Sequence, residues 1–327
     1  MTATTERTGL RVRSSISTAA PVFLGGLLSL AAGCSSLPQA GVSQSGLAAP
    51  LLPILGKDGG KGGELFVSDF YSSEILIYPA GVQNPAPTGS ISNGVSYPYN
   101  LAVDKAGTLY VQNNNNTVTE YPKGATSPSA TLVEPPYGYG TGITVTVGRD
   151  LTVYTADHLA GKVFEFKSGY RSPTTTLSVQ EAFGLALDSK NNLYVGWAPS
   201  SSGGPGRVMK FKPGATSGKD LGITVKYQGG LAIDAHDNLL VGDQGNRVID
   251  IFRRGAKTPF RTINTSPAYP YQFALDKANR YLYLVSGTPA AVYVYDYATG
   301  ALAWTDTQGM KGSGYAEGVA LRPVAKP

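Results

Sequence analysis

The sequence predicts an all-β fold, a six-bladed β-propeller, because one short apolar motif recurs six times at nearly constant spacing. Its best copies are Leu101-Ala102-Val103-Asp104 and Leu185-Ala186-Leu187-Asp188, and the steps between first positions are 42, 42, 46, 42 and 46 residues. A period of about 40–50 residues that holds several short strands is typical of propeller blades. Helix signals are nearly absent beyond the leader, and Gly (41), Pro (22) and Tyr (20) are frequent, as expected for strands joined by tight turns. The six first positions are Leu101, Ile143, Leu185, Leu231, Phe273 and Val319.

Residues 1–33 predict a targeting segment that is removed from the mature protein. Three arginines precede an apolar stretch over residues 16–30, which is too short to favour a membrane-spanning helix. Small residues then precede Cys34, the only cysteine of the chain. This arrangement resembles a bacterial lipoprotein signal, although Ala31 stands where leucine is the commoner residue. The resemblance implies that Cys34 is lipidated and becomes the mature N-terminus, and a secretory leader with an incidental cysteine is the alternative.

Residues 34–63 are rich in Ser, Gln, Ala, Gly and Pro and end in a glycine-rich run, which predicts a flexible tether. The predicted organisation is therefore a signal peptide over 1–33, the lipidated cysteine and tether over 34–63, and a propeller over 64–327. We expect the mature protein in the bacterial cell envelope, attached to a membrane by its N-terminal lipid.

Each repeat holds three recognisable strands and a looser fourth, with β-branched and aromatic residues bounded by Gly, Pro and Asn. A glycine at position 81, 124, 169, 214, 255 or 300 is predicted to close the turn into the fourth strand. The third strands begin at Ile75, Val118, Val163, Val208, Val248 and Val292, and three residues later stand Tyr78, Tyr121, Phe166, Phe211, Ile251 and Tyr295. The predicted second strands are Leu65-Phe66-Val67, Leu109-Tyr110-Val111, Leu151-Thr152-Val153, Leu193-Tyr194-Val195, Leu239-Leu240-Val241 and Leu282-Tyr283-Leu284.

The first and last repeats are complementary fragments. The first starts at its second strand, at Leu65, and the last, Val319-Ala320-Leu321, is a first strand without a second. The C-terminal strand is therefore predicted to complete the N-terminal blade, which closes the ring and removes an open sheet edge.

Two features of the first strands have a structural interpretation. Their second position is small, which is expected where six strands converge on one axis: Ala102, Thr144, Ala186, Ala232, Ala274 and Ala320. Four of them end in an aspartate, and a carboxylate that starts a hairpin turn usually accepts hydrogen bonds from backbone N–H groups. We predict this capping role, in preference to a metal site, for Asp104, Asp188, Asp234 and Asp276.

Two segments resemble units of NHL-repeat and gluconolactonase-like six-bladed propellers, and the resemblance extends over about residues 64–322. The segments are Gly184-Leu185-Ala186-Leu187-Asp188 and Val241-Gly242-Asp243-Gln244-Gly245-Asn246-Arg247-Val248. The resemblance implies the fold but no single activity, because lactonases, lyases and binding modules share it. For the enzymes it implies a divalent metal at the channel mouth, and Glu181 or Glu317 with Asn100 and Asp243 offers oxygen ligands that suit Ca²⁺ or Mg²⁺. No family motif matches residue by residue, so no catalytic residue is assigned, and a solvated or capping role is favoured for the carboxylates.

In five of the six repeats, a tyrosine stands four residues before the first position of the apolar motif. We expect these positions to form a collar at one mouth of the central channel, on the face made by the loops into the first strands and between the second and third strands. Tyrosine combines a flat apolar ring with a hydroxyl, which suits sugar rings or peptide side chains. The alternative is that the rings only pack between neighbouring blades. The candidate ligand-binding residues are Tyr97, Tyr139, Glu181, Tyr227, Tyr269 and Tyr315.

Charge and histidine content exclude several functions. Loss of residues 1–33 changes the net charge from +5 to +3 without leaving a basic cluster, which does not support nucleic-acid binding. His158 and His236 are predicted on opposite faces, so they cannot share a zinc ion or a catalytic triad. We therefore expect a monomeric binding or scaffold module for a glycan or protein ligand, without catalysis and without a cofactor. The alternative is a lactonase- or lyase-like enzyme that depends on Ca²⁺ or Mg²⁺ at the channel mouth.

Overall fold

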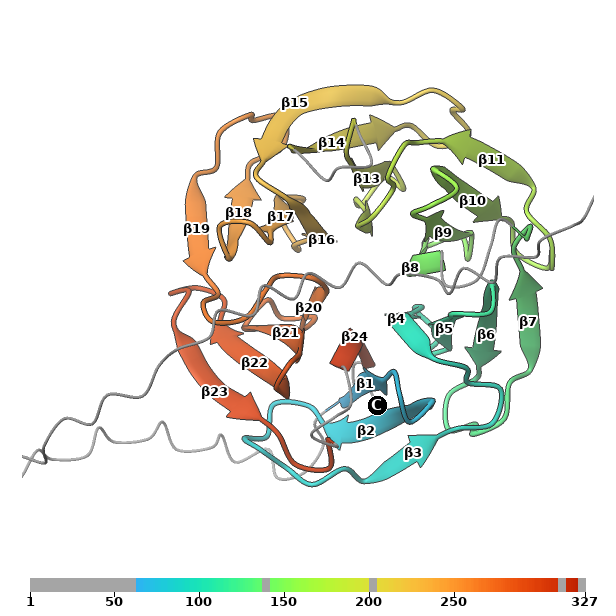
Figure 1. The fold of residues 1–327 in the computed structure, drawn as a ribbon, viewed down its shortest axis with the longest axis vertical. Helices are drawn as coiled ribbons and strands as arrows, with labels where there is room; N and C mark the ends of the chain where they lie inside the picture. Colours follow the sequence, from blue (N-terminus) through green and yellow to red (C-terminus); the bar gives the residue numbers. More distant parts are fainter. Residues whose placement is uncertain (1–62, 137–141, 200–204, 311–315, 323–327) are drawn as a thin grey trace, which may run out of the picture. The chain divides into compact units, whose positions relative to one another are not determined.

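The structure is a computed structural model that describes residues 63–136, 142–199, 205–310 and 316–322. These residues form six four-stranded antiparallel sheets and contain no helix. The sheets are arranged as blades around one axis, in the order of the sequence (Figure 1). The predicted all-β, six-bladed propeller is confirmed. Over the same residues, no helix has the length and apolar character needed to span a membrane.

Each blade runs from an innermost strand to an outermost strand, and its four members follow in that order. Blade 1 holds β24 (Ala316–Arg322), β1 (Glu64–Asp69), β2 (Glu74–Pro79) and β3 (Gly89–Ile91). Blade 2 holds β4 (Pro98–Val103), β5 (Leu109–Asn113), β6 (Thr117–Tyr121) and β7 (Ala130–Val133). Blade 3 holds β8 (Gly142–Val147), β9 (Val153–Asp157), β10 (Lys162–Phe166) and β11 (Thr175–Ser178).

The remaining three blades repeat the same plan without a break in the chain order. Blade 4 holds β12 (Leu185–Leu187), β13 (Leu193–Trp197), β14 (Gly206–Phe211) and β15 (Lys219–Val225). Blade 5 holds β16 (Gln228–Ile233), β17 (Leu239–Asp243), β18 (Val248–Phe252) and β19 (Arg261–Asn264). Blade 6 holds β20 (Phe273–Leu275), β21 (Tyr281–Gly287), β22 (Ala290–Asp296) and β23 (Leu302–Asp306).

The C-terminal strand closes the ring as predicted. β24 pairs antiparallel with β1, and Val319 lies opposite Val67 while Arg322 lies opposite Glu64. At the end of this pair the Arg322 Nη1 lies 2.6 Å from Glu64 Oε2, and its guanidinium stacks 4.6 Å from the centre of the Phe66 ring. The inner edge of β1 is thereby occupied by a strand from the other end of the described chain.

The hydrophobic core consists of six clusters, one between each pair of neighbouring blades. Between blades 1 and 2, for example, Phe66 and Ala320 pack with Leu101 and Leu109. The small side chain of Ala320 fits because neighbouring sheets approach each other most closely near the axis. The blades are held by burial against their neighbours, as expected of repeats that have no core of their own.

Blade 3 departs from the predicted register by two residues in its first two strands. In blade 2, Leu101 lies opposite Val111, and the equivalent pair in blade 3 is Val145 opposite Thr155. The first position of the motif in blade 3 is therefore Val145, and the prediction of Ile143 is wrong. The second strand is β9, and the predicted Leu151-Thr152-Val153 falls mostly in the turn before it, where Leu151 has φ 64°. Alternation of apolar residues cannot distinguish a shift of two residues, because the same side chains stay on the same face.

Blade 5 departs by one residue in its third strand. In blade 2, Tyr121 pairs with Leu109, and the equivalent pair in blade 5 is Phe252 with Leu239. The predicted positions Val248 and Ile251 are therefore wrong by one residue, and the equivalent positions are Ile249 and Phe252. Ile249 is buried between blades 5 and 6, whereas Phe252 is buried between blades 4 and 5. Both faces of this strand are apolar, which is why its pattern did not determine which residue faces which neighbour.

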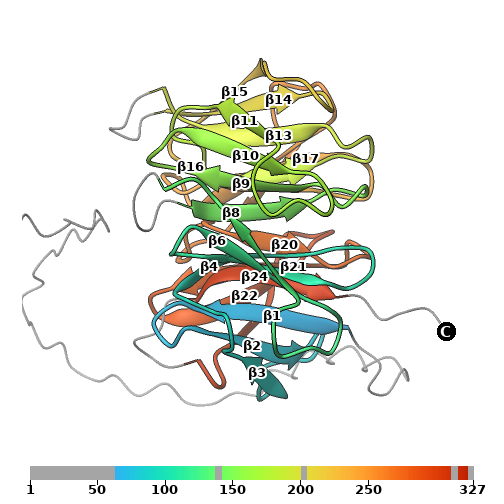
Figure 2. The ribbon, with the colours of Figure 1, turned by 90° about the vertical axis from the view of Figure 1, so that its right-hand side faces the viewer.

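The turns between the first and second strands confirm the capping role of the four aspartates. The Asp104 carboxylate accepts hydrogen bonds from the backbone N–H groups of Ala106 and Thr108, each at 2.8 Å. Asp188, Asp234 and Asp276 accept the equivalent bonds in blades 4, 5 and 6. The six predicted turn glycines all have left-handed φ values, between 72° and 86°. Seen from the side, the turns and loops lie on two opposite faces of the ring (Figure 2).

Candidate functional site

One face of the propeller carries the loops into the innermost strands and the turns between the second and third strands. These segments are joined by backbone hydrogen bonds, such as those from Asn114 N to Tyr97 O at 3.2 Å and from Gln244 N to Tyr227 O at 2.9 Å. We call this surface the tyrosine face, defined by the loops before β4, β12, β16 and β20 and the turns β1–β2, β5–β6, β9–β10 and β17–β18. The loops are therefore held in place by the sheets beneath them.

Three of the predicted tyrosines are exposed on this face. Tyr97 is 47% exposed, Tyr227 38% and Tyr269 51%, whereas Glu181 is largely covered. Tyr139 and Tyr315 lie outside the described residues, as does Cys34. The exposed rings stand in the entry loops of blades 2, 5 and 6, so three rings from well-separated parts of the sequence share one face.

Two of the three exposed rings, Tyr97 and Tyr269, pack against a neighbouring side chain. Tyr97 packs against Phe70 with ring centroids 5.4 Å apart, and its backbone N–H donates to Ser73 Oγ at 3.1 Å. The Tyr269 hydroxyl accepts a hydrogen bond from Arg247 Nη2 at 2.6 Å, and the guanidinium lies 4.4 Å from the ring centre. Tyr97 and Tyr269 therefore pack against adjacent segments and still expose part of their rings.

A second group of aromatic rings surrounds the axis at this face. Phe183 of the blade 4 entry loop meets Tyr271 of the blade 6 entry loop edge to face, with ring centroids 4.9 Å apart. Tyr99 packs on Phe70 at 4.9 Å, and burial followed by the charge of Glu317 raises the pKa of Tyr99 to about 12. Burial and the same carboxyl also raise the pKa of Tyr271 well above its usual value. Glu317 thus lies next to rings from blades 2 and 6.

Glu317 is the most unusual titratable group of this face. Burial raises the pKa of Glu317 to about 7, and no hydrogen bond or cation among the described residues opposes the effect. A carboxyl whose pKa is strongly raised by burial marks a candidate binding or catalytic site. The sequence had marked Glu317 as one of two acidic loop residues, and its position at the axis follows from β24 being an innermost strand.

Glu181 is placed differently from the expected free carboxylate. Its Oε2 lies 2.8 Å from Nε2 of His158, in the β9–β10 turn, and the imidazole packs edge to face on Phe183 at 5.9 Å. His158 thus lies on the tyrosine face, and His236, in the β16–β17 turn, lies on the opposite face, as predicted. An open depression lies beside this pair, and its lining includes His158, Leu159, Gly161, Ser178, Gln180 and Glu181.

The axis is closed below the aromatic rings. Gln272 of blade 6 donates a hydrogen bond from Nε2 to Thr144 Oγ1 of blade 3 at 2.9 Å, and both side chains are buried. Blades 3 and 6 stand opposite each other in the ring, so this bond spans the centre (Figure 1). Side chains from opposite blades therefore meet at the axis of the propeller.

Three of the four oxygen-bearing residues of the metal hypothesis have protein partners, and Glu181 is paired with His158. The Asp243 carboxylate accepts hydrogen bonds from the backbone N–H groups of Lys226, Tyr227, Gly245 and Asn246. Asn100 Oδ1 accepts one from Val145 N at 3.4 Å. Within the described ranges no set of three or more His, Cys, Asp or Glu side chains is arranged to hold a metal.

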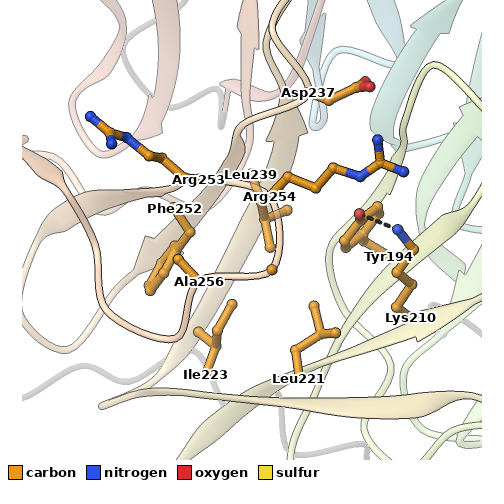
Figure 3. A pocket seen from close by; sticks show the side chains of 11 residues that line it. Tyr194, Lys210, Leu221, Ile223, Asp237, Leu239, Phe252, Arg253, Arg254 and Ala256 are labelled. Atoms are coloured by element: carbon orange, nitrogen blue, oxygen red, sulfur yellow. Dashed lines mark hydrogen bonds between the residues drawn. The ribbon is translucent and has the colours of Figure 1, made fainter.

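A separate cavity of about 200 Å³ lies on the opposite face, between blades 4 and 5. Its lower wall is apolar, with Leu221, Ile223 and Phe252, while Arg254 and Lys210 reach its rim (Figure 3). The Lys210 ammonium donates a hydrogen bond to the Tyr194 hydroxyl at 2.6 Å. None of the predicted site residues lines this cavity.

Comparison with known proteins places the chain in the class of six-bladed β-propellers by its fold. A chain from the crystal structure of a nidogen/laminin complex superposes with a TM-score of 0.64 at 14% identity, covering 80% of this chain and 98% of that one. A protein of unknown function from Bacteroides caccae superposes with a TM-score of 0.58 at 13% identity, again covering 80% of this chain and 98% of that one. No protein-family model and no curated protein matches the sequence. Identities this low carry information on the fold alone.

Proposed function

We propose that this protein is an exported, lipid-anchored binding or scaffold module whose tyrosine face contacts a glycan or protein ligand. The observation that carries this proposal is the exposure of Tyr97, Tyr227 and Tyr269 on one face of the ring, the same face on which Glu317 lies next to Tyr99 and Tyr271. Held aromatic rings contribute apolar contact area at low entropic cost, and their hydroxyls add hydrogen bonds. The nidogen/laminin complex includes a propeller of the same fold, which is compatible with protein recognition.

The test is a binding screen on the full-length chain. We expect wild-type protein to retain members of a glycan array or a cross-linked envelope protein, and the Tyr97→Ala/Tyr227→Ala/Tyr269→Ala variant to lose at least tenfold in affinity for the same molecule. Aromatic anchors at interfaces often contribute about 2 kcal/mol each when truncated, which makes such a loss a modest expectation. Tyr170→Ala is the matched control, because Tyr170 is 59% exposed in the β10–β11 turn on the opposite face. Equal binding by the triple variant would refute the assignment of this face.

Anchoring by Cys34 has its own test. We expect wild-type protein in the membrane fraction of a bacterial host, and Cys34→Ala protein to be released or to remain an uncleaved precursor. Metabolic labelling with a fatty-acid analogue should mark the wild type alone. Label on the variant, or an unlabelled wild type, would show that the N-terminal segment is an ordinary leader.

A further inference from the structure

The cavity between blades 4 and 5 has an apolar floor to which both blades contribute. It lies on the face opposite to the tyrosine face, where the β16–β17 and β18–β19 turns approach the end of β14 and the start of β15. Leu221 and Ile223 stand on β15 of blade 4, and Leu239 and Phe252 stand on β17 and β18 of blade 5. Ile223, Leu239 and Phe252 are buried, and Leu221 is partly buried. A ligand in this cavity would therefore contact mainly apolar side chains.

A tyrosine occupies the equivalent place between blades 5 and 6. Tyr297 comes two residues after Tyr295, whose register position in blade 6 corresponds to that of Phe252 in blade 5. The Tyr297 ring is buried between the two blades, and its hydroxyl donates a hydrogen bond to Asp234 Oδ2 at 3.0 Å. The residue two positions after Phe252 is Arg254, which is exposed. An arginine thus stands where a ring packs in the next interface, and a cavity remains there.

The rim of the cavity is cationic on the side of blade 4. Arg254 reaches across the opening toward Lys210 and Tyr194, whereas Arg253 points to the other side (Figure 3). The Lys210 ammonium lies 3.1 Å from Asp188 Oδ2 and donates a hydrogen bond to the Tyr194 hydroxyl. Burial alone would lower the pKa of Lys210, but these hydrogen bonds raise it overall, so the ammonium is charged at neutral pH.

Arg254 is the rim cation with a free guanidinium. Asp237, the carboxylate nearest to it on the rim, accepts hydrogen bonds from Ser189 N at 2.9 Å and from Ser189 Oγ at 2.6 Å. The hydrogen bonds from Ser189 lower the pKa of Asp237, and the charge of Arg254 adds to this effect. Within the described ranges, Arg254 forms no hydrogen bond or ion pair of its own. Lys210, Arg253 and Arg254 line the cavity together with one carboxylate, so an anion is the favoured ligand.

We propose that this cavity binds a small monocarboxylate whose apolar tail is about as large as a benzene ring. A cavity of about 150 Å³ lined by Leu, Ile and Phe can hold benzene, and this one measures about 200 Å³. The tail would lie on Leu221, Ile223 and Phe252, and the carboxylate would face the planar guanidinium of Arg254, which suits both of its oxygens. The charge of Asp237 on the same rim disfavours a dianionic phosphate. This ligand site is separate from the tyrosine face and goes beyond the proposed function.

The experiment is a ligand-observed NMR titration of the full-length chain at low salt with 3-phenylpropionate as the probe. We expect saturable binding with a Kd on the order of 0.1–1 mM, which suits a ligand of about ten non-hydrogen atoms. The neutral analogue 3-phenylpropan-1-ol should bind at least about fivefold more weakly, because it lacks the charge that pairs with Arg254. Acetate, which has no tail to cover the apolar floor, should not saturate below about 10 mM.

Two variants and a matched control identify the site. Arg254→Gln should weaken 3-phenylpropionate binding at least about fivefold and leave the binding of 3-phenylpropan-1-ol unchanged, because only the charged contact is lost. Ala256→Leu should weaken both compounds, because Ala256 lines the cavity and a larger side chain fills it. Lys123→Gln should bind like wild type. Lys123 is the exposed residue two positions after Tyr121, whose register position in blade 2 corresponds to that of Phe252.

A further control separates this cavity from the tyrosine face. The Tyr97→Ala/Tyr227→Ala/Tyr269→Ala variant should bind 3-phenylpropionate like wild type, because its changes lie on the opposite face. The proposal is overturned if wild type shows no saturable binding of 3-phenylpropionate, if Arg254→Gln binds both compounds like wild type, or if the triple tyrosine variant loses the binding. If circular dichroism shows that Ala256→Leu does not fold, the response of Arg254→Gln decides.

Discussion

Single aspartates at the turns between innermost and second strands stabilise this fold through hydrogen bonds, in addition to the burial of apolar residues. Asp188 is buried and accepts hydrogen bonds from the backbone N–H groups of Lys190 and Asn192, and from the side chains of Asn192 and Lys210. Burial tends to raise the pKa of this carboxyl, but these hydrogen bonds outweigh it and lower the pKa to about 2. The ionised form of Asp188 is therefore more stable in the folded chain than in the unfolded chain.

Asp188→Asn should lower the free energy of unfolding by about 1–3 kcal/mol at pH 7, because several donors lose a charged acceptor. The folded pKa is below the unfolded value of about 3.9, so the contribution of Asp188 is present above that pH and lost as pH falls towards 2. Urea denaturation of both proteins at pH 7 and pH 2.5 measures this. Asp220→Asn, at an exposed pair with Arg207, should change stability by less than about 0.5 kcal/mol. A pH-independent difference for Asp188→Asn would contradict the assignment.

The pKa of Glu317 is shifted upward, opposite to that of Asp188. Its folded pKa of about 7 exceeds the unfolded value, so the folded state holds the proton more tightly and loses stability as pH rises from about 4.5 to 8. Glu317→Gln should therefore be more stable than wild type at pH 8, by about 1–2 kcal/mol, which allows for the water that the partly exposed side chain retains. The gain should vanish at pH 4.5. Thermal melts at the two pH values decide, and a variant less stable than wild type at pH 8 would contradict the raised pKa.

At the scale of elements, the closing strand has the largest consequence. β24 fills the inner edge of β1, and its Ala316, Val319 and Ala320 are buried against blades 6 and 2. Without it, β1 would expose both its backbone groups and its apolar side chains.

Deletion of residues 316–327 should abolish cooperative thermal unfolding and promote aggregation, because blade 1 loses its innermost strand. Near-UV circular dichroism and light scattering measure the two effects. Addition in trans of a peptide that covers residues 316–322 should partly restore the signal. Leu302→Ala, at a residue 52% exposed on the outermost strand β23, should leave the melt unchanged. A truncated chain that unfolds like wild type would show that ring closure is dispensable.

The element scale also shows where sequence reasoning failed. Strand identity could be predicted in all six blades from alternation and turn glycines, but the register in blade 3 was wrong by two residues and in blade 5 by one. In blade 3, Gly148 occupies the turn position that aspartate holds in blades 2, 4, 5 and 6, so the repeat lacks its marker. In blade 5, every position of the third strand except Asp250 is apolar or aromatic. Register in such strands is determined by packing against both neighbours.

At the scale of the whole molecule, the ring is held by six similar interfaces and by the closing pair of strands. The paired ends, Glu64 and Arg322, lie directly opposite each other. The chain ends of the propeller can therefore be joined without moving any blade.

A circular permutant with a short glycine linker from Arg322 to Gly63, opened between Asn93 and Gly94, should fold with the same far-UV circular dichroism spectrum. Its six blades would each be continuous, so no blade would be shared between the two ends. We expect its Tm to fall by a few degrees, because the ring would then be closed only by side-chain packing between blades 1 and 2 and no longer by strand pairing within blade 1. Analytical ultracentrifugation of both proteins compares their association states. Failure to fold would mean that the split blade is essential to assembly and not only to stability.

The sequence by itself determined the number of blades, the capping aspartates, the turn glycines and the complementary ends, because each depends on local periodicity or on backbone conformations that few residues adopt. The tertiary structure alone decided which side chains meet: Glu317 with Tyr99 and Tyr271 at the axis, His158 with Glu181, and Gln112 with Glu134 and Thr155 between blades 2 and 3. These groups come from different repeats. Glu317 meets Tyr99 and Tyr271 because closure of the ring brings β24 beside β4 and β20, whereas the other two groups form where consecutive blades pack against each other.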